Sequence, residues 1–259
     1  MQINGIFFTF NQKNIMCFYY CLTKKNPTKL IENKVIREEQ LSLFDNTFLV
    51  NGFEHPAMPV ITDEKPEEIQ FFRWGIIPHW VKDIETAQSI RNNTLNAKSE
   101  TIFEKASFKY SIRNKRCLIL CSGFFEWQKV KGKKYPYYIS LQNDEVFVFG
   151  GIWSSWADTE SGEIINTYAV ITVEANELVG KIHNTKKRMP LILEPEKALQ
   201  WIDKNSTEKE IREMMKPIDE SKMKANTIQK FMPAKPGDSS NPEIIAYYHY
   251  PELMDFISS

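Results

Sequence analysis

The feature that most constrains the fold is a run of five apolar residues, Cys117 to Cys121, near the middle of the chain. A continuous apolar run of this length predicts a strand that is buried on both faces. A Ser-Gly pair at 122–123 breaks the run, and the sequence FFEW follows at 124–127. One carboxylate therefore stands among three large aromatic side chains at the end of a buried strand.

This carboxylate, Glu126, has two interpretations. A carboxylate in an apolar setting is costly unless it is paired, hydrogen-bonded or protonated. Such a group often has a raised pKa and transfers protons. Alternatively, Glu126 lies on the solvent-facing side of an amphipathic strand. The stretch by itself slightly favours the second interpretation, so the rest of the chain has to decide between them.

Length and composition restrict the class of protein. The 259 residues suit one large domain or two small ones, and an aromatic content of 13% argues against disorder. The 33 basic and 33 acidic residues balance, so any binding of nucleic acid must come from a local patch. No apolar stretch approaches the length of a membrane span, and residues 1–15 lack the basic start of a signal peptide. We therefore expect a cytoplasmic protein without membrane contact.

Turn signals and hydrophobic patterning divide the chain into strands with a few helices. A hairpin is predicted around the KGKK sequence at 131–134. Its strands cover 125–130 and 135–141, and further strands are expected at 17–21, 44–62 (two, joined by a loop), 69–77, 117–121, 145–153, 164–173 and 191–193. Helices are expected after Ser99 or Thr101, over 174–180 with an end at Gly180, over 195–202 and over 207–215. The pattern indicates one domain of the α+β class.

The four cysteines form two Cys-x3-Cys pairs, Cys17/Cys21 and Cys117/Cys121, a pattern that raises the question of a zinc site. On a strand, the two members of such a pair lie about 13 Å apart at ~3.3 Å per residue, too far to share one ion. We therefore expect no metal and no other cofactor, and no disulfide framework. Cys21, Cys117 and Cys121 are expected to be buried apolar residues.

Cys17 differs from the other cysteines because it directly follows Met16. If translation started at Met16 and this residue were removed, Cys17 would carry a free α-amine with a pKa near ~8 beside its thiol. Such an amine can form a Schiff base with an aldehyde, and the thiol can then close a thiazolidine ring. If the printed start is native, Cys17 is one more buried cysteine.

Two other polar residues, Asn96 and His183, also have alternative roles. Asn96 precedes a predicted helix, where its amide can hold a substrate or an α-amine, or can simply serve turn geometry. His183 begins the basic sequence HNTKKRMP, where it can shuttle a proton or be merely solvated.

A local surface for nucleic acid is predicted as well. Trp74 and Trp80 can stack on bases, although most tryptophans are core residues. The cations that can bind phosphate on this surface are Arg73, Arg91, Lys98, Arg113, Lys186, Lys187 and Arg188.

Five short motifs occur together in one order along the chain. They are Met16-Cys17, RWGIIPHW at 73–80, NAKSET at 96–101, CSGFFEW at 121–127, and IHN at 182–184 with RMP at 188–190. This series resembles the SOS response-associated peptidase (SRAP) family of abasic-site processing proteins. The resemblance implies a single domain over residues 16–259, with a mainly antiparallel, barrel-like sheet and short inserted helices.

The resemblance also implies an enzyme-like role in the DNA damage and SOS response. Such a protein binds single-stranded DNA and forms a covalent thiazolidine crosslink with abasic sites through an N-terminal cysteine, which Cys17 matches. Asn96 matches the residue that positions the amine and thiol. Glu126 matches the residue that transfers protons, and His183 the residue that assists ring opening and crosslink reversal.

Positions that contact DNA in the family are matched by Trp74, as a stacking wedge, and by Pro56 and Lys98. Arg73 and Arg188, from the basic surface described above, are added to them as DNA-binding residues. The expected partner is single-stranded DNA with abasic sites, bound by a monomer.

The chain departs from the family pattern at several places. Phe18-Tyr19 stands where the family commonly has Gly-Arg, GFEHP at 52–56 replaces Asn-Val-Ala-Pro, and Ala106 replaces an arginine. Residues 1–15 form an extension that the family pattern lacks, and with it Cys17 has no α-amine. Either the native start is Met16 or the extension is cleaved, since the family carries a proposed autopeptidase activity; we favour the first explanation.

Two other functions remain open at this stage. The protein can be a non-covalent module for single-stranded DNA whose extended N-terminus disables the chemistry. It can also be a cysteine-dependent protease built on Cys17, His183 and Glu126.

Overall fold

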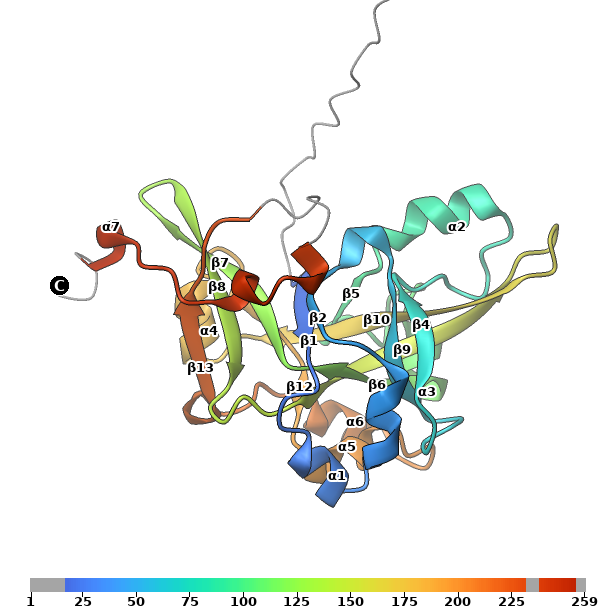
Figure 1. Ribbon diagram of the computed structural model, residues 1–259. Helices are drawn as coiled ribbons and strands as arrows, with labels where there is room; N and C mark the ends of the chain where they lie inside the picture. Colours follow the sequence, from blue (N-terminus) through green and yellow to red (C-terminus); the bar gives the residue numbers. More distant parts are fainter. Residues whose placement is uncertain (1–16, 232–237, 255–259) are drawn as a thin grey trace, which may run out of the picture.

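The structure is a computed structural model that describes residues 17–231 and 238–254 (Figure 1). The predicted extension at 1–15 lies outside the described residues. The strands are β1 (Tyr19–Leu22), β2 (Thr47–Asn51), β3 (Ala57–Thr62), β4 (Gln70–Trp74), β5 (Asn96–Lys98), β6 (Arg116–Cys121), β7 (Gly123–Val130), β8 (Lys133–Leu141), β9 (Phe147–Ala157), β10 (Ile164–Glu174), β11 (Arg188–Pro190), β12 (Ile192–Leu193) and β13 (Met223–Thr227). The α-helices are α1 (Thr28–Glu32), α2 (Ile84–Arg91), α3 (Lys109–Asn114), α4 (Glu177–Ile182), α5 (Pro195–Trp201), α6 (Glu208–Met214) and α7 (Pro251–Met254), and short 3-10 helices include η2 (Gly52–Glu54).

Five strands close into a barrel. Their hydrogen-bonded order is β10–β4–β3–β6–β9, and β9 pairs back onto β10. Within this ring the contact of β10 with β4 is parallel, and the other contacts are antiparallel. The structure thus confirms an α+β domain with a mainly antiparallel, barrel-like core.

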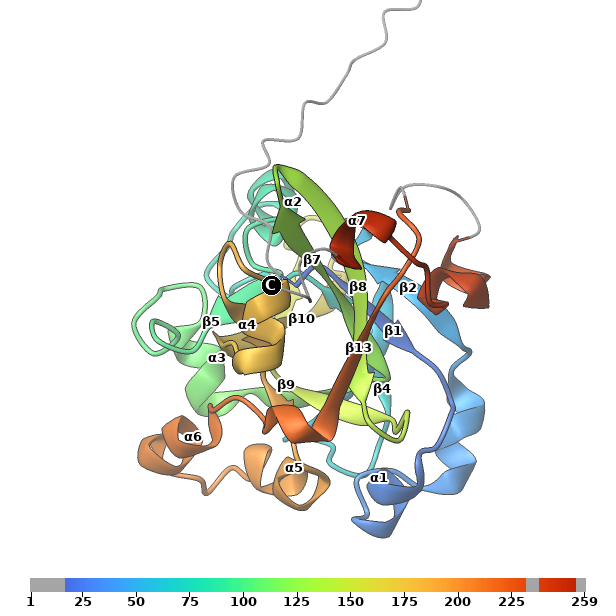
Figure 2. The same ribbon diagram turned by 90° about the vertical axis from the view of Figure 1, so that its left-hand side faces the viewer.

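A second sheet has the order β13–β8–β7–β1–β2, and Figure 2 shows β7, β8 and β13 side by side. The chain enters it from the barrel at the Ser-Gly pair between β6 and β7. Ser122 anchors this junction, because its Oγ accepts a hydrogen bond from the backbone N–H of Thr23 at 2.8 Å. Gly123 is needed there because a Cβ would overlap the ring of Tyr138. The break in the apolar run is therefore one of the points at which the chain passes between the two sheets.

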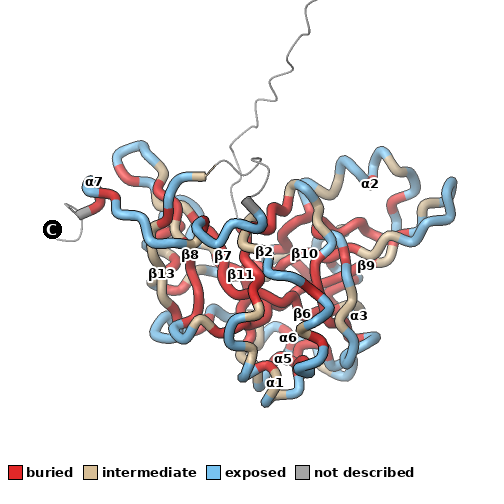
Figure 3. The backbone as a smooth tube through the Cα atoms, viewed as in Figure 1, coloured by how far each residue is buried: buried red, intermediate tan, exposed pale blue. Residues whose placement is uncertain are grey.

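The predicted buried strand is confirmed as β6, whose six residues are all buried. The barrel strands β6, β9 and β10 are mainly buried, as the red stretches of the tube in Figure 3 show, and Cys21, Cys117 and Cys121 are fully buried free cysteines. The hairpin around 131–134 is also confirmed as β7–β8. Among the described residues, no helix has the length and hydropathy needed to cross a bilayer.

The helix predicted after Ser99 or Thr101 does not begin there. Asn96–Lys98 instead form β5, which pairs in parallel with β10, and the N–H of Ser99 continues toward the same strand by donating to the carbonyl of Thr172 at 3.0 Å. Turns follow, and the helix starts only at Lys109. Pairing with a distant strand thus overrides the local capping signal.

A buried arginine, Arg116, joins the barrel to the ends of two helices. It is 1% exposed, and its guanidinium donates to four backbone carbonyls. These belong to Ile112 and Arg113 at the end of α3 (both 3.0 Å), and to Trp201 and Asp203 at and beyond the end of α5 (2.7 and 2.6 Å). The side chain therefore satisfies carbonyls that end-of-helix geometry leaves without donors.

Arg116→Met is expected to lower the free energy of unfolding by about 3–5 kcal/mol, because it leaves several buried carbonyls without donors. Urea denaturation measures this change. Arg212→Met, on the exposed face of α6, is the matched control and is expected to stay within about 0.5 kcal/mol of wild type. Equal stabilities of the two variants would contradict the structural role of Arg116.

Candidate functional site

The structure brings four of the predicted residues together from four separate elements. Cys17 precedes β1, Asn96 begins β5, Glu126 lies on β7, and His183 follows α4 as its C-cap. The Cys17 thiol donates to Oε1 of Glu126 at 2.6 Å, and Nδ2 of Asn96 donates to the carbonyl of Cys17 at 3.1 Å. Nδ1 of His183 lies 3.5 Å from the same Glu126 oxygen. All four residues are buried.

Glu126 does not lie on a solvent-facing side, so the amphipathic interpretation is wrong. Its side chain is 1% exposed, and burial raises its pKa, an effect that the facing imidazole of His183 and the hydrogen bond from Cys17 oppose. A buried carboxyl with a raised pKa holds its proton to higher pH than usual and is suited to give and take a proton. The structure therefore supports the proton-transfer interpretation.

The Cys17 thiol is held in its protonated form. Burial raises its pKa well above the ordinary value, and the charge of Glu126 raises it further. A thiol in this setting is not a pre-formed thiolate. It can act as a nucleophile only when a base accepts its proton, and Glu126 is already in hydrogen-bonding contact to do so.

His183 is fixed in one orientation. Helix α4 was predicted to end at Gly180, but it runs on to Ile182 and places the imidazole toward β7. Nδ1 contacts the carbonyl of Arg188 at 2.9 Å. Because a carbonyl only accepts, Nδ1 carries the hydrogen, and Nε2 of the neutral ring is left as the proton acceptor.

Three buried polar atoms of this region lack a hydrogen-bond partner among the described residues. They are Oδ1 of Asn96, Nε2 of His183 and Nε of Arg188. Buried polar groups are rarely left unpaired in native proteins, so a cluster of them indicates a place for the polar atoms of a substrate. Around Cys17, the Asn96 oxygen is thus available as a hydrogen-bond acceptor, the His183 nitrogen as a proton acceptor and the Arg188 nitrogen as a cationic donor.

The side chain of Arg188 is nevertheless partly engaged. On β11, its guanidinium forms an ion pair with Glu100 and donates to the carbonyl of Thr172. Lys98, at the end of β5, is exposed, and so is Arg73 on β4, while Pro56 is half-buried.

Trp74 does not have the exposed ring that a stacking wedge requires. It is 1% exposed, its Nε1 donates to the carbonyl of Leu95 at 2.8 Å, and its ring packs against Tyr20 and Tyr168. Trp80, in the same motif, is 46% exposed. Of the two tryptophans in this motif, Trp80 thus has the exposed ring that can stack on a base, and Trp74 is packed in the core.

Asn184, which follows His183 in the IHN motif, is a positioning residue. Its side chain pairs with β7 as a neighbouring strand would: Oδ1 accepts from the N–H of Lys129 at 3.1 Å, and Nδ2 donates to its carbonyl at 2.9 Å. Gln128 adds a hydrogen bond to the carbonyl of Lys181 at 3.2 Å. These contacts tie the segment that carries His183 to the strand that carries Glu126. An Asn next to a His in a loop gave no specific signal for this.

Asn184→Ala is expected to slow the reaction of the site about tenfold, since it removes two hydrogen bonds of about 1 kcal/mol each that fix His183. Asn184→Asp keeps the acceptor and loses the donor, so its rate should lie between those of wild type and Asn184→Ala. Single-turnover kinetics with the substrate proposed below measure the order. A rate for Asn184→Ala equal to wild type would contradict the positioning role.

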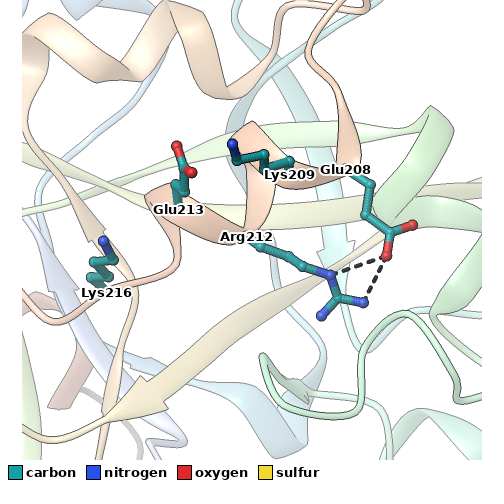
Figure 4. A pocket seen from close by; sticks show the side chains of 5 residues that line it. All are labelled: Glu208, Lys209, Arg212, Glu213 and Lys216. Atoms are coloured by element: carbon teal, nitrogen blue, oxygen red, sulfur yellow. Dashed lines mark hydrogen bonds and ion pairs between the residues drawn. The ribbon is translucent and has the colours of Figure 1, made fainter.

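Other features of the described residues do not compete with this site. No group of three or more His, Cys, Asp or Glu side chains there is placed to hold a metal ion. A hollow at α6 is lined by the charged side chains shown in Figure 4, namely Glu208, Lys209, Arg212, Glu213 and Lys216. These belong to one exposed helix and the chain just after it, and Figure 4 shows Arg212 paired with Glu208.

Comparison with known proteins places this arrangement in a family. The sequence profile described as "SOS response associated peptidase (SRAP)" matches residues 16–233, most of the chain. The chain belongs to the SRAP family. Similar SRAP relatives include "Abasic site processing protein YoqW" of Bacillus subtilis (strain 168), which is 32% identical over 209 residues that cover 76% of this chain and 89% of YoqW.

Another relative and two solved structures are also similar to this chain. "Abasic site processing protein HMCES" of Gallus gallus is 34% identical over 176 residues, covering 60% of this chain and 51% of HMCES. A crystal structure of a protein from Bacteroides thetaiotaomicron has a TM-score of 0.79 and 35% identity, and covers 90% of this chain and 100% of that chain. One from Bordetella bronchiseptica, at 20% identity and a TM-score of 0.69, shares the fold.

Proposed function

We propose that this protein processes abasic sites in DNA and that, when its chain begins at Cys17, it traps them in single-stranded DNA as a thiazolidine crosslink. The relatives named as abasic site processing proteins support the broader statement. The observation that carries the finer one is the buried hydrogen bond of 2.6 Å between the Cys17 thiol and Glu126. It pairs the only residue type that can close a thiazolidine with a group that can accept its proton.

The proposed reaction has two steps. The α-amine of Cys17 adds to the aldehyde of the ring-opened sugar, and the carbonyl oxygen leaves as water to give a Schiff base. The thiol then adds to the C=N carbon, its proton goes to Glu126, and the nitrogen takes up a proton. One C–N bond and one C–S bond form, and one water is released.

The neighbouring side chains contribute to both steps. Asn96 anchors Cys17 through its carbonyl, and the unpaired Oδ1 of the same amide can accept a hydrogen bond from the α-amine. Protonated Glu126 serves as the acid for loss of water. His183, with Nε2 free to accept a proton, assists ring opening of the sugar and reversal of the crosslink.

The DNA is proposed to lie across the surface that surrounds this site. Trp80 stacks on a base, Pro56 borders the abasic nucleotide, and Lys98 and Arg73 contact phosphates from exposed positions. Arg188 lies closer to the reaction centre and contributes the cationic Nε described above.

The active form is proposed to arise by initiation at Met16 and removal of that residue. Cleavage ahead of Cys17 by the protein itself would give the same product. Intact-mass analysis of native protein distinguishes a chain that begins at Cys17 from one that retains residues 1–16.

A denaturing gel tests the proposed function. Protein that begins at Cys17 is incubated with single-stranded DNA that carries one abasic site. We expect a shifted band that resists denaturation and is absent for Cys17→Ala. No shifted band, with Cys17 verified as the first residue, would leave a non-covalent DNA-binding module in its place.

The geometry disfavours the cysteine-protease alternative. The Cys17 thiol is bonded to a carboxylate rather than to the imidazole, and its raised pKa is the opposite of what a protease nucleophile needs. The hydrogen bond of His183 Nδ1 goes to a backbone carbonyl.

A further inference from the structure

Three cationic or titratable side chains gather behind Trp74, outside the four-residue site. His55 follows η2, Arg73 lies on β4, and Arg91 ends α2. The carbonyl of Trp74 accepts from Nδ1 of His55 at 2.7 Å and from Nη2 of Arg91 at 3.4 Å. Gly75 permits this approach: its φ is +102°, and a Cβ there would lie 2.9 Å from Nδ1 of His55.

The two arginines of this cluster lack the carboxylate partner that most arginines of the described residues have. Among the described residues neither Arg73 nor Arg91 has an acidic oxygen within 4.0 Å, whereas Arg113 and Arg212 are both paired with Glu208. The Nε of Arg91 is buried without a hydrogen-bond partner. A guanidinium that has no carboxylate partner and a buried Nε without an acceptor indicates a bound anion.

The electrostatics agree with the geometry. Burial, followed by the charge of Arg73, lowers the pKa of Arg91 to about 10. Burial, followed by the charges of Arg91 and, more weakly, Arg73, lowers the pKa of His55, while its hydrogen bonds to Trp74 and Asn92 oppose that change. No carboxylate is among the causes for either group. An anion between them would relieve both the repulsion and the unsatisfied donor.

The cluster adjoins the proposed DNA path. The N–H of Trp74 donates to the carbonyl of Pro56 at 3.0 Å, and its indole donates to Leu95, the neighbour of Asn96. A Cβ on Gly52, whose N–H bonds the carbonyl of Phe18, would contact the Trp74 ring at 3.1 Å. A single buried tryptophan therefore separates the cationic cluster from the elements that hold Cys17 and Asn96.

We propose that His55, Arg73 and Arg91 form a binding site for one backbone phosphate of single-stranded DNA, close to the abasic nucleotide. This inference rests on the proposed function and adds to it a defined contact that fixes the register of the strand. A phosphodiester is always ionised, and its two unbridged oxygens match the planar fork of a guanidinium.

Scanning single phosphates tests this site. Wild-type protein is titrated with oligonucleotides that carry a tetrahydrofuran abasic analogue, which has no aldehyde, and one neutral methylphosphonate at successive positions. We expect one position at which neutralisation weakens binding about tenfold, as for removal of a charge-assisted hydrogen bond. In Arg91→Gln, and in Arg73→Gln at an exposed position, the loss of affinity at that phosphate should shrink, while the losses at other phosphates remain.

Arg212→Gln, on α6 and away from the site, is the matched control and should reproduce the wild-type scan. The slope of log affinity against log salt should also fall by about 0.7 for each phosphate that a variant no longer neutralises. Scans of both arginine variants that superimpose on wild type would overturn the proposal. If those scans are unchanged and inorganic phosphate nevertheless shifts the NMR signals of His55, the proposal is also overturned, because the cluster is then a general anion site.

The proposed function is assessed separately in the same experiment. Wild-type protein is incubated in parallel with a true abasic oligonucleotide on a denaturing gel. A wild-type protein that shows the phosphate position but no crosslink would sink the covalent function and leave the phosphate site standing.

Discussion

Replacing Glu126 by glutamine is expected to slow crosslink formation by about 10²- to 10⁴-fold, the usual contribution of a positioned acid or base. The glutamine side chain can still accept the hydrogen bond from Cys17 but can neither give nor take a proton. The carboxyl acts twice in the proposed reaction, first in loss of water and then as acceptor of the thiol proton. Single-turnover kinetics on denaturing gels measure the rate.

Glu104→Gln, on an exposed turn, is the matched control and should keep the wild-type rate. A Glu126→Gln variant that reacts within a few-fold of wild type would show that water, rather than this carboxyl, carries the protons. Such a result would leave Cys17 and Asn96 in their roles but remove Glu126 from the mechanism.

The same substitution has an expected effect on stability. Burial raises the pKa of Glu126 above its ordinary value of 4.5. Between the ordinary and the raised pKa, the folded state binds more protons than the unfolded state, so the free energy of unfolding falls as pH rises through that window. Glu126→Gln should lack this fall. Thermal unfolding from about pH 4 to pH 8 tests whether the two curves converge at low pH and separate at higher pH.

A single residue left ahead of Cys17 is expected to abolish the stable adduct. In a chain that retains Met16, the nitrogen of Cys17 is an amide, which cannot form a Schiff base, and a thiol alone adds to an aldehyde reversibly. Protein that begins at Met16 and protein that begins at Cys17 are compared on a denaturing gel with the same abasic oligonucleotide. Equal yields would contradict the need for an α-amine.

Cys17→Ser, in a chain that begins at residue 17, separates the amine from the thiol. It keeps the α-amine, so we expect a Schiff base that survives denaturation only after reduction with borohydride. Wild-type protein should give a stable band without a reductant. A stable unreduced band from Cys17→Ser would show that ring closure by sulfur is not what makes the adduct durable.

Much of the fold could be predicted because its signals are local. The apolar run at 117–121 can satisfy burial on both faces only inside a sheet, and the KGKK turn fixes the β7–β8 register. The Ser-Gly pair indicates only that the run is interrupted, and the structure shows that the chain passes there from the barrel to the second sheet.

Local signals are insufficient where distant contacts decide. Pairing with β10 makes Asn96–Lys98 a strand rather than the approach to a helix. Trp74 and Trp80 stand in one motif and cannot be told apart by composition. Contacts with Tyr20 and Tyr168, which are distant in sequence, help to bury Trp74, whereas Trp80 is exposed.

In the candidate site, too, local motifs indicate which residues take part, whereas distant contacts decide how they are placed. Short motifs indicated Cys17, Asn96, Glu126 and His183, but whether Glu126 faced solvent or the site depended on how β1, β7 and α4 meet. The pairing of Asn184 with Lys129 depends on the part of β7 that extends beyond its short pairing with β1, which no local pattern reveals.

The central claim is that Cys17 reacts through both its amine and its thiol, and mass spectrometry of the unreduced adduct tests it most directly. Protein that begins at Cys17 is reacted with an abasic oligonucleotide, denatured and treated with a thiol-alkylating reagent. The chain has four cysteines, so we expect an adduct mass equal to protein plus DNA minus one water, with three alkyl groups added instead of four. An adduct that accepts four alkyl groups, or one that forms only after reduction, would contradict the thiazolidine.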